Sequence, residues 1–211
     1  MKLIRLAFAA GLALTVAGCM APDSNAVVGA PEISARNTPL DMSIAPAAMV
    51  NSYDVQDIVV VVPAALRVSE ANSYYPMGDI VWRGDPYGDR HVQIKALFDS
   101  AAARGALDLS GDVPVIAEIT LVRFHGVTER TRFSIGGVYN VEFNLTIRNA
   151  LTGQIIEGPR FVEANLPAPG GSAAIMLDQS GQTERVRMLD FLTHLLIDEL
   201  SPATPTVVAS L

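Results

Sequence analysis

The sequence is poor in the residues that most often carry out catalysis or bind metals. Its 211 residues include one cysteine and three histidines. A single cysteine excludes a disulfide within the chain. His91, His125 and His194 stand far apart, whereas metal sites usually gather several ligands at short spacing. No nucleophile-elbow or phosphate-binding glycine motif is present, so we expect no catalytic, cofactor-binding or metal-binding residue and interpret the chain as a protein that is not an enzyme.

Basic residues are also scarce. Lysine and arginine number 15 against 22 acidic residues, which gives a formal net charge of −7. Nucleic-acid binding depends on basic contacts to phosphate, so a nucleic-acid partner is not expected. An acidic chain is also repelled by anionic lipid head groups, and a basic patch would not hold it to a membrane.

The N-terminus has the pattern of a secretory signal peptide. Lys2 and Arg5 precede the apolar run Leu6–Val16. That run is shorter than the roughly 20 apolar residues that a membrane-spanning helix needs. The small residues Ala17 and Gly18 follow it, as is typical of a cleavage site.

The segment Val16-Ala17-Gly18-Cys19 resembles the lipobox of bacterial lipoproteins. The resemblance implies a diacylglyceryl group on the Cys19 thiol, cleavage before Cys19, and acylation of the new amine by a fatty acid such as palmitate. Met20, in place of an aspartate that favours the inner membrane, implies an outer-membrane lipoprotein with its domain facing the periplasm. An ordinary thiol after a standard signal peptide, or an uncleaved anchor, are the alternatives.

Composition divides the chain into four parts. We expect a signal peptide over residues 1–18, a lipidated N-terminus and flexible tether over 19–51, one periplasmic domain over 52–200, and a loose tail over 201–211. The tether is rich in proline and small polar residues, and about 30 such residues reach roughly 30 Å. Alternatively, parts of it pack along the domain.

Hydrophobic periodicity predicts the elements of the domain. Residues 55–62 contain four consecutive valines and read as a central strand covered on both faces. Residues 90–104 fit a helix with Asp89 as its N-cap and Gly105 as its C-terminal cap. The remaining predictions are a short edge strand or continuation at 66–69, strands at 115–124, 139–148 and 154–166, and a helix at 183–200. Residues 125–134 are expected to form a long hairpin loop or the extended tips of both flanking strands, and residues 167–172 a loop.

This order of elements indicates an α+β fold of two layers. We expect an antiparallel or mixed sheet of about four to five strands, with two helices packed on one face. The strand at 139–148 alternates apolar and polar residues, which is typical of a sheet with one buried and one solvated face. Gly158-Pro159 is expected to interrupt the last strand.

Two segments have the composition of an interaction surface. Trp82, Arg83, Asp85 and Arg90 lie in a turn-rich stretch, and tryptophan beside charged residues is common at binding hot spots. The alternative is that Trp82 fills space between helix and sheet while its charged neighbours make local contacts.

The second segment is a local positive group in an acidic chain. Arg123, Arg130 and Arg132, with His125, suit a carboxylate or a lipid phosphate. The alternative is a solvated loop.

The stretches 79–86 and 123–138 are similar to small envelope lipoproteins of uncharacterised function. We therefore hypothesise a lipid-anchored, non-enzymatic protein-interaction module in the periplasm. The alternative function is a binder or carrier of a lipid or small amphiphile, auxiliary to an envelope transport system.

Overall fold

The computed structural model describes residues 52–201. The predicted signal peptide, Cys19, the tether and nearly all of the tail lie outside the described residues. The elements are, in chain order, β1 (Tyr53–Val61), β2 (Ile80–Val81), α1 (Arg90–Ala103), the 3₁₀ turn η1 (Ala106–Asp108), β3 (Val113–His125), α2 (Glu129–Arg132), β4 (Gly137–Asn149), β5 (Ile155–Ala168), α3 (Ser172–Gln179) and α4 (Glu184–Leu200).

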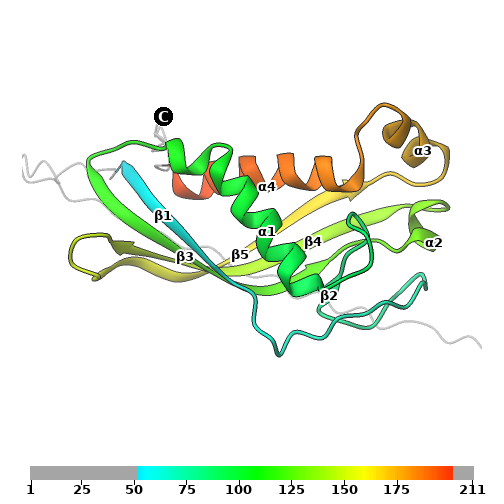
Figure 1. The fold of residues 1–211 in the computed structure, drawn as a ribbon, viewed down its shortest axis with the longest axis horizontal. Helices are drawn as coiled ribbons and strands as arrows, with labels where there is room; N and C mark the ends of the chain where they lie inside the picture. The colour runs from blue at the N-terminus through cyan, green and yellow to red at the C-terminus, as the bar shows by residue number, and fades with distance from the viewer. Residues whose placement is uncertain (1–51, 202–211) are drawn as a thin grey trace, which may run out of the picture. The chain divides into compact units, whose positions relative to one another are not determined.

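The strands form one mixed sheet (Figure 1). Its order is β1-β3-β4-β5, and the short β2 pairs with the end of β3 beyond β1. β1 and β3 are parallel and joined through α1, whereas β3, β4 and β5 are an antiparallel meander. Phe143 marks the middle of the sheet, where it lies opposite Leu121 on one side and Val162 on the other.

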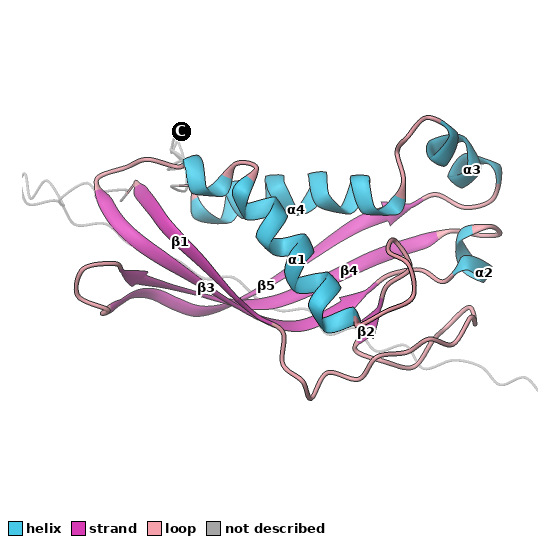
Figure 2. Cartoon of the chain, viewed as in Figure 1, coloured by secondary structure: helices cyan, strands magenta, loops and turns pink. Residues whose placement is uncertain are grey.

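The core lies between one face of the sheet and two helices (Figure 2). Alternate residues of β4, from Tyr139 to Ile147, are buried against this layer, as their period of two predicts. α1 and α4 pack against each other, and Phe98 of α1 meets Phe143 edge to face at 6.0 Å between ring centroids. Asp89 caps α1 by accepting hydrogen bonds from the His91 and Val92 amides.

The predicted fold class is confirmed: the protein has an α+β fold with a mixed sheet of five strands. Both long helices begin and end within one residue of their predicted bounds. The interruption predicted at Gly158-Pro159 is a shift in the pairing register, and β5 continues through it. Within residues 52–201, every helix is too short or too polar to cross a bilayer.

The prediction that residues 55–62 form a central strand, covered on both faces, is wrong. β1 lies at one end of the order β1-β3-β4-β5, and Val59 and Val61 are 41 % and 47 % exposed on the open face. Consecutive valines favour an extended backbone, but they do not determine which strands lie beside it. Here the crossover through α1 places β1 outside β3.

Gly105 also has a different role from the predicted cap. Its φ of −173° is extended rather than left-handed, so it forms no C-terminal glycine cap. A Cβ atom there would lie 2.7 Å from Ile197 Cδ1, so the absence of a side chain lets α4 approach the end of α1. The residues predicted as a short strand at 66–69 form a single bridge, from Val68 to Ile80.

Two short helices replace parts of the predicted loops. α2 lies within residues 125–134, and α3 begins at the end of residues 167–172. Both lie near the carboxyl end of β3 and the start of β4, opposite the end at which β1 begins (Figure 1). β3 has 13 residues, so the two ends are about 40 Å apart at roughly 3.3 Å per residue.

Candidate functional site

Trp82 lies in the core directly after β2. Its side chain is fully buried, and its ring meets Phe124 edge to face at 5.5 Å. Its indole Nε1–H donates to Asp85 Oδ2 at 2.7 Å, so its one polar atom is satisfied within the turn. A Cβ atom on Gly84 would lie 2.3 Å from the indole, so the turn requires glycine there. Trp82 therefore fills space between the helices and the sheet.

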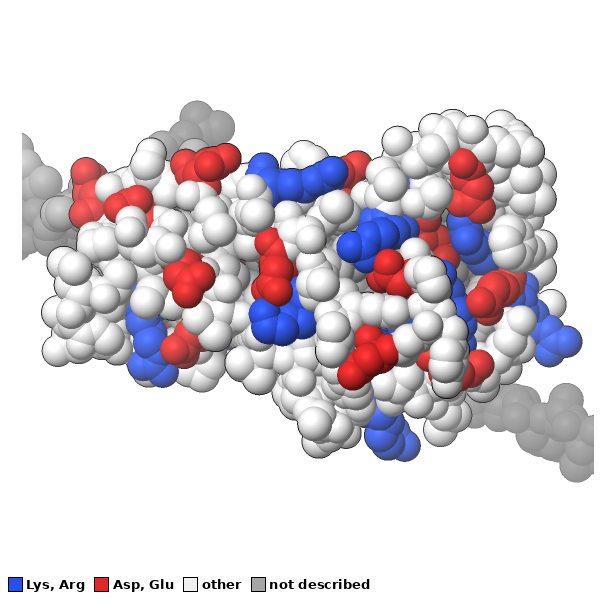
Figure 3. Space-filling model, in the orientation of Figure 1, with Lys and Arg blue, Asp and Glu red and all other residues white. Residues whose placement is uncertain are grey.

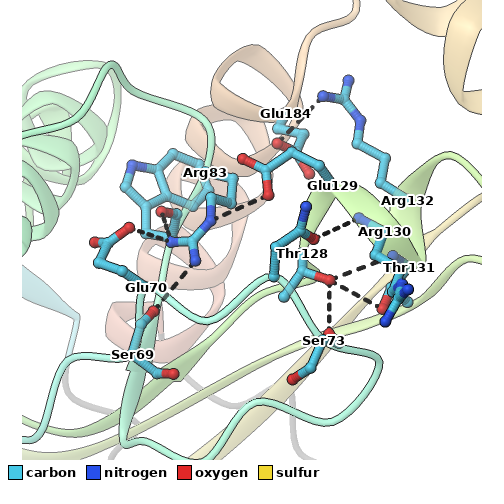
Figure 4. A network of polar contacts seen from close by, with 12 residues as sticks. Ser69, Glu70, Ser73, Arg83, Thr128, Glu129, Arg130, Thr131, Arg132 and Glu184 are labelled. Carbon is cyan, nitrogen blue, oxygen red and sulfur yellow. Dashed lines mark hydrogen bonds and ion pairs between the residues drawn. The ribbon is translucent and has the colours of Figure 1, made fainter.

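Arg83 and Arg90 are also turned inward. The Arg83 side chain is 6 % exposed and forms ion pairs with Glu70 at 2.9 Å and with Glu129 at 3.3 Å. Arg90 Nε donates to Glu70 Oε1 at 2.8 Å, and its Nη1 donates to the carbonyls of Asp85 and Pro86. The hydrogen bond from Arg90 holds the pKa of Glu70 below its ordinary value. Figure 4 shows Glu70 and Glu129 reaching Arg83 from two different segments.

Asp85 connects this turn to α4. Both of its carboxylate oxygens accept hydrogen bonds from Arg185 Nη1, at 2.6 and 2.7 Å. The four residues predicted as an interaction surface in this segment thus make most of their contacts within the domain. Their arrangement corresponds to the alternative in which Trp82 fills space between helix and sheet, and little of these side chains is accessible to a partner.

The segment after β3 is arranged differently. Thr128 caps α2, and its hydroxyl also donates to the Ser73 carbonyl at 2.8 Å. The Arg130 amide donates to Asn72 Oδ1 at 2.8 Å. These bonds fasten α2 to the long connection between β1 and β2 (Figure 4).

An open groove lies between that connection and the start of β4. It has a volume of about 350 Å³ and is lined by residues 74–76, 125–128, 131 and 135–138. Its exposed members are mostly apolar or aromatic: Tyr75 is 87 % exposed, Ile135 71 % and Val138 49 %. Met77, which follows directly on the lining residues 74–76, is 85 % exposed. Part of the lining is glycine backbone, at 126, 136 and 137.

The predicted positive group is only partly assembled around this groove. His125 lines it, and its Nδ1–H donates to the Gly78 carbonyl at 3.2 Å. Burial, reinforced by the charge of Arg123, lowers the pKa of His125, so the ring is neutral near pH 7. The Arg130 guanidinium lies 5.3 Å from the centroid of the Tyr74 ring, in a cation–π contact at the edge of the groove.

Arg132 is turned away from the other members of the group. It forms ion pairs with Asp178 of α3 and with Glu184 of α4. Glu184 is buried, and its Oε1 accepts a hydrogen bond from the Tyr139 hydroxyl, while its Oε2 lies 3.3 Å from Arg132 without a well-aligned hydrogen bond. Burial raises the pKa of both Glu184 and Tyr139. This cluster joins α2, α3 and α4 and is internal.

Positive and negative side chains are interspersed over the face shown in Figure 3 and do not gather into one patch. The apolar groove, rather than a charged patch, is therefore the candidate site. Sequence reasoning missed Tyr74, Tyr75, Ile135 and Val138 as site residues. Two adjacent tyrosines in an irregular connection were the available signal, but their proximity to β4 depends on tertiary contacts.

The sequence matches the profile of a family of unknown function, DUF6778, over residues 53–210. The chain belongs to this family. A search of curated proteins gives no match. The family assignment covers the whole described domain and carries no assigned chemistry.

Two solved structures are similar to the domain at low identity. A Xanthomonas campestris protein assigned to the DUF330 family aligns with a TM-score of 0.41 and 12 % identity, over 74 % of this chain and 86 % of that chain. A minor lipoprotein from Acinetobacter baumannii aligns with a TM-score of 0.31 and 11 % identity, over 68 % and 91 % respectively.

Proposed function

We propose that the protein is a lipoprotein, anchored through acyl chains on Cys19 to the outer membrane, whose domain binds a partner protein of the envelope in the groove. The proposed module is not an enzyme. The observation that carries the proposal is the groove itself, whose lining includes the exposed side chains of Tyr75, Ile135 and Val138 and some glycine backbone. Exposed apolar patches on soluble domains commonly mark interaction sites.

The position of the groove supports a partner other than the anchoring membrane. The chain from Cys19 enters the domain at β1, and the groove lies near the carboxyl end of β3, about 40 Å away by strand length. A domain attached by one end and binding by the other can reach from its membrane toward a second component.

The test is site-specific photo-crosslinking in cells. A photoreactive amino acid at Tyr75 is expected to form one dominant protein adduct, and Ile135→Arg is expected to abolish it. The matched controls are the same probe at Tyr87, which is 85 % exposed in the turn before α1, and Val92→Arg on the exposed side of α1. Equal adducts from both probe positions, or an adduct unaffected by Ile135→Arg, would exclude the groove.

The anchor is tested separately. Labelled palmitate is expected to enter the wild-type protein and not Cys19→Ala, and Met20→Asp is expected to move the protein from outer-membrane to inner-membrane fractions. Loss of the Tyr75 adduct in Cys19→Ala would show that binding depends on the anchor. Palmitate labelling of Cys19→Ala would refute lipidation at this residue.

The volume of the groove is also compatible with the alternative function, binding of a lipid or small amphiphile. About 350 Å³ is within the range of small-molecule sites, roughly 300–1,000 Å³. A lipid or small amphiphile could therefore occupy it. Mass spectrometry of the protein released gently from cells would detect such a ligand, and Ile135→Arg would then remove it.

A further inference from the structure

Most arginines of the domain are neutralised by carboxylates of the same chain. Within residues 52–201, the arginines without an ion pair to a carboxylate are Arg123, Arg130 and Arg187. Arg187 donates to the Pro167 carbonyl instead. The hydrogen bond from the Arg67 amide lowers the pKa of Asp79, and the charge of the nearby Arg123 adds to this effect. Of these three arginines, Arg130 is the one whose guanidinium contacts a residue of the groove lining, Tyr74.

The contacts of Arg130 hold it at the groove without neutralising it. Its amide is bonded to Asn72, and its guanidinium packs near the ring of Tyr74, which lines the groove. A cation–π contact uses the face of the guanidinium, whereas hydrogen bonds to a carboxylate use its edge. Within residues 52–201 the Arg130 guanidinium makes no hydrogen bond besides this contact with Tyr74, so its N–H donors are available.

The nearest acidic residue along the chain is already engaged. Glu129 is paired with the buried Arg83 at 3.3 Å. The titratable residues that line the groove are His125 and two tyrosines. The lowered pKa of His125 keeps its ring neutral near pH 7. One positive charge thus remains beside an apolar groove, on a protein whose net charge is −7.

We propose that the segment bound in the groove is an apolar stretch of the partner protein with an aspartate or glutamate beside it, whose carboxylate pairs with Arg130. This inference rests on the proposed function and specifies the chemistry of the partner. The apolar residues of the segment contact Tyr75, Ile135 and Val138. Because the protein carries a net negative charge, the pair with Arg130 also favours binding of the segment at the groove over binding elsewhere on the surface.

The experiment uses the full-length protein in cells with the photoreactive probe at Tyr75 and varies Arg130 alone. Arg130→Glu is expected to lower the adduct yield about tenfold or more, the scale of a lost charged hydrogen bond. Arg130→Lys, which keeps the charge, is expected to remain within about threefold of wild type. Lys95→Glu makes the same change in net charge at an exposed site on α1 and is expected to have no effect.

Sequencing the crosslinked peptide by mass spectrometry supplies an independent readout. We expect an aspartate or glutamate within a few residues of the crosslinked position, next to apolar residues. An adduct that forms equally in Arg130→Glu, or a crosslinked peptide without an acidic residue, would overturn this inference and leave the groove as the binding site. If Tyr75 yields no protein adduct, or only a lipid adduct, the proposed function itself fails, and this inference fails with it.

Discussion

Two segments of this protein look alike in composition but lie in opposite environments. In the turn from Trp82 to Arg90, Trp82 is buried, and the charges of Arg83, Asp85 and Arg90 are paired with Glu70, Glu129 and Arg185. The segment from His125 to Val138 borders an open groove, and Arg130 has no carboxylate partner in the described domain. Tryptophan and arginine favour binding surfaces only when their own chain leaves them unsatisfied. The difference is therefore decided by residues distant in sequence, which composition does not reveal.

The largest contrast between the two segments should appear when one aromatic is removed from each. We expect Trp82→Ala to lower the free energy of unfolding by about 3–5 kcal/mol, because it leaves a cavity in the core and removes one hydrogen-bond donor to Asp85. Tyr75→Ala should change it by less than about 0.5 kcal/mol, since its side chain is mostly exposed. Denaturant unfolding of the two purified variants measures both values. Similar losses would mean that the tyrosine is part of the core.

A matched pair of arginine substitutions sharpens the comparison. Arg83→Met should cost about 1–3 kcal/mol of stability, because Glu70 and the Ser69 carbonyl lose a charged donor in a partly buried site. Arg130→Met should leave stability within about 0.5 kcal/mol of wild type and affect partner binding instead. Thermal unfolding, read beside the crosslinking yield from Tyr75, separates the two effects. A stability loss in Arg130→Met as large as in Arg83→Met would contradict the distinction.

Local sequence patterns predicted the elements that depend on local contacts. Asp89 and the apolar spacing after it placed α1, and alternation from Tyr139 to Arg148 placed β4. Patterns could not place what depends on distant neighbours. The valines of β1 indicated a strand but not an edge, and α3 buries only Ala174 and lacks a side-chain cap, so it has little periodic signal.

The candidate site was predictable only in part, for the same reason. Arg130 and His125 were identified as candidates by their residue types, and both border the groove. Arg132, two residues later, could not be distinguished from them, because its partners Asp178 and Glu184 come from α3 and α4. The single-turn helix α2 places Arg130 and Arg132 on opposite sides of the chain. The hydroxyl of its N-cap, Thr128, donates a hydrogen bond to the Ser73 carbonyl, 55 residues away in sequence.

A smaller effect should distinguish the internal ion pairs from exposed ones. A double-mutant cycle with Asp85→Asn and Arg185→Gln should give a coupling energy of about 1 kcal/mol, since Asp85 is mostly buried and binds Arg185 through both oxygens. The cycle with Lys95→Gln and Asp99→Asn, an exposed pair one helical turn apart, should give about 0.3–0.5 kcal/mol. Equal coupling in both cycles would show that burial adds nothing at the Trp82 turn.

The smallest expected effect concerns His125, which lies at the groove but is half-buried. Its pKa in the folded state is lowered, first by burial, so the unfolded chain binds the proton more tightly. Its contribution to stability is therefore fully present above pH 6.5 and is lost as the pH falls through the lowered folded pKa.

His125→Asn keeps a donor for the Gly78 carbonyl and does not titrate. Between pH 8 and pH 5, wild type should lose more stability than this variant, while their difference at pH 8 gives the cost of the substitution alone. Parallel curves would show that the proton enters the folded groove without penalty, and His125 would then belong to its solvated rim rather than to its wall.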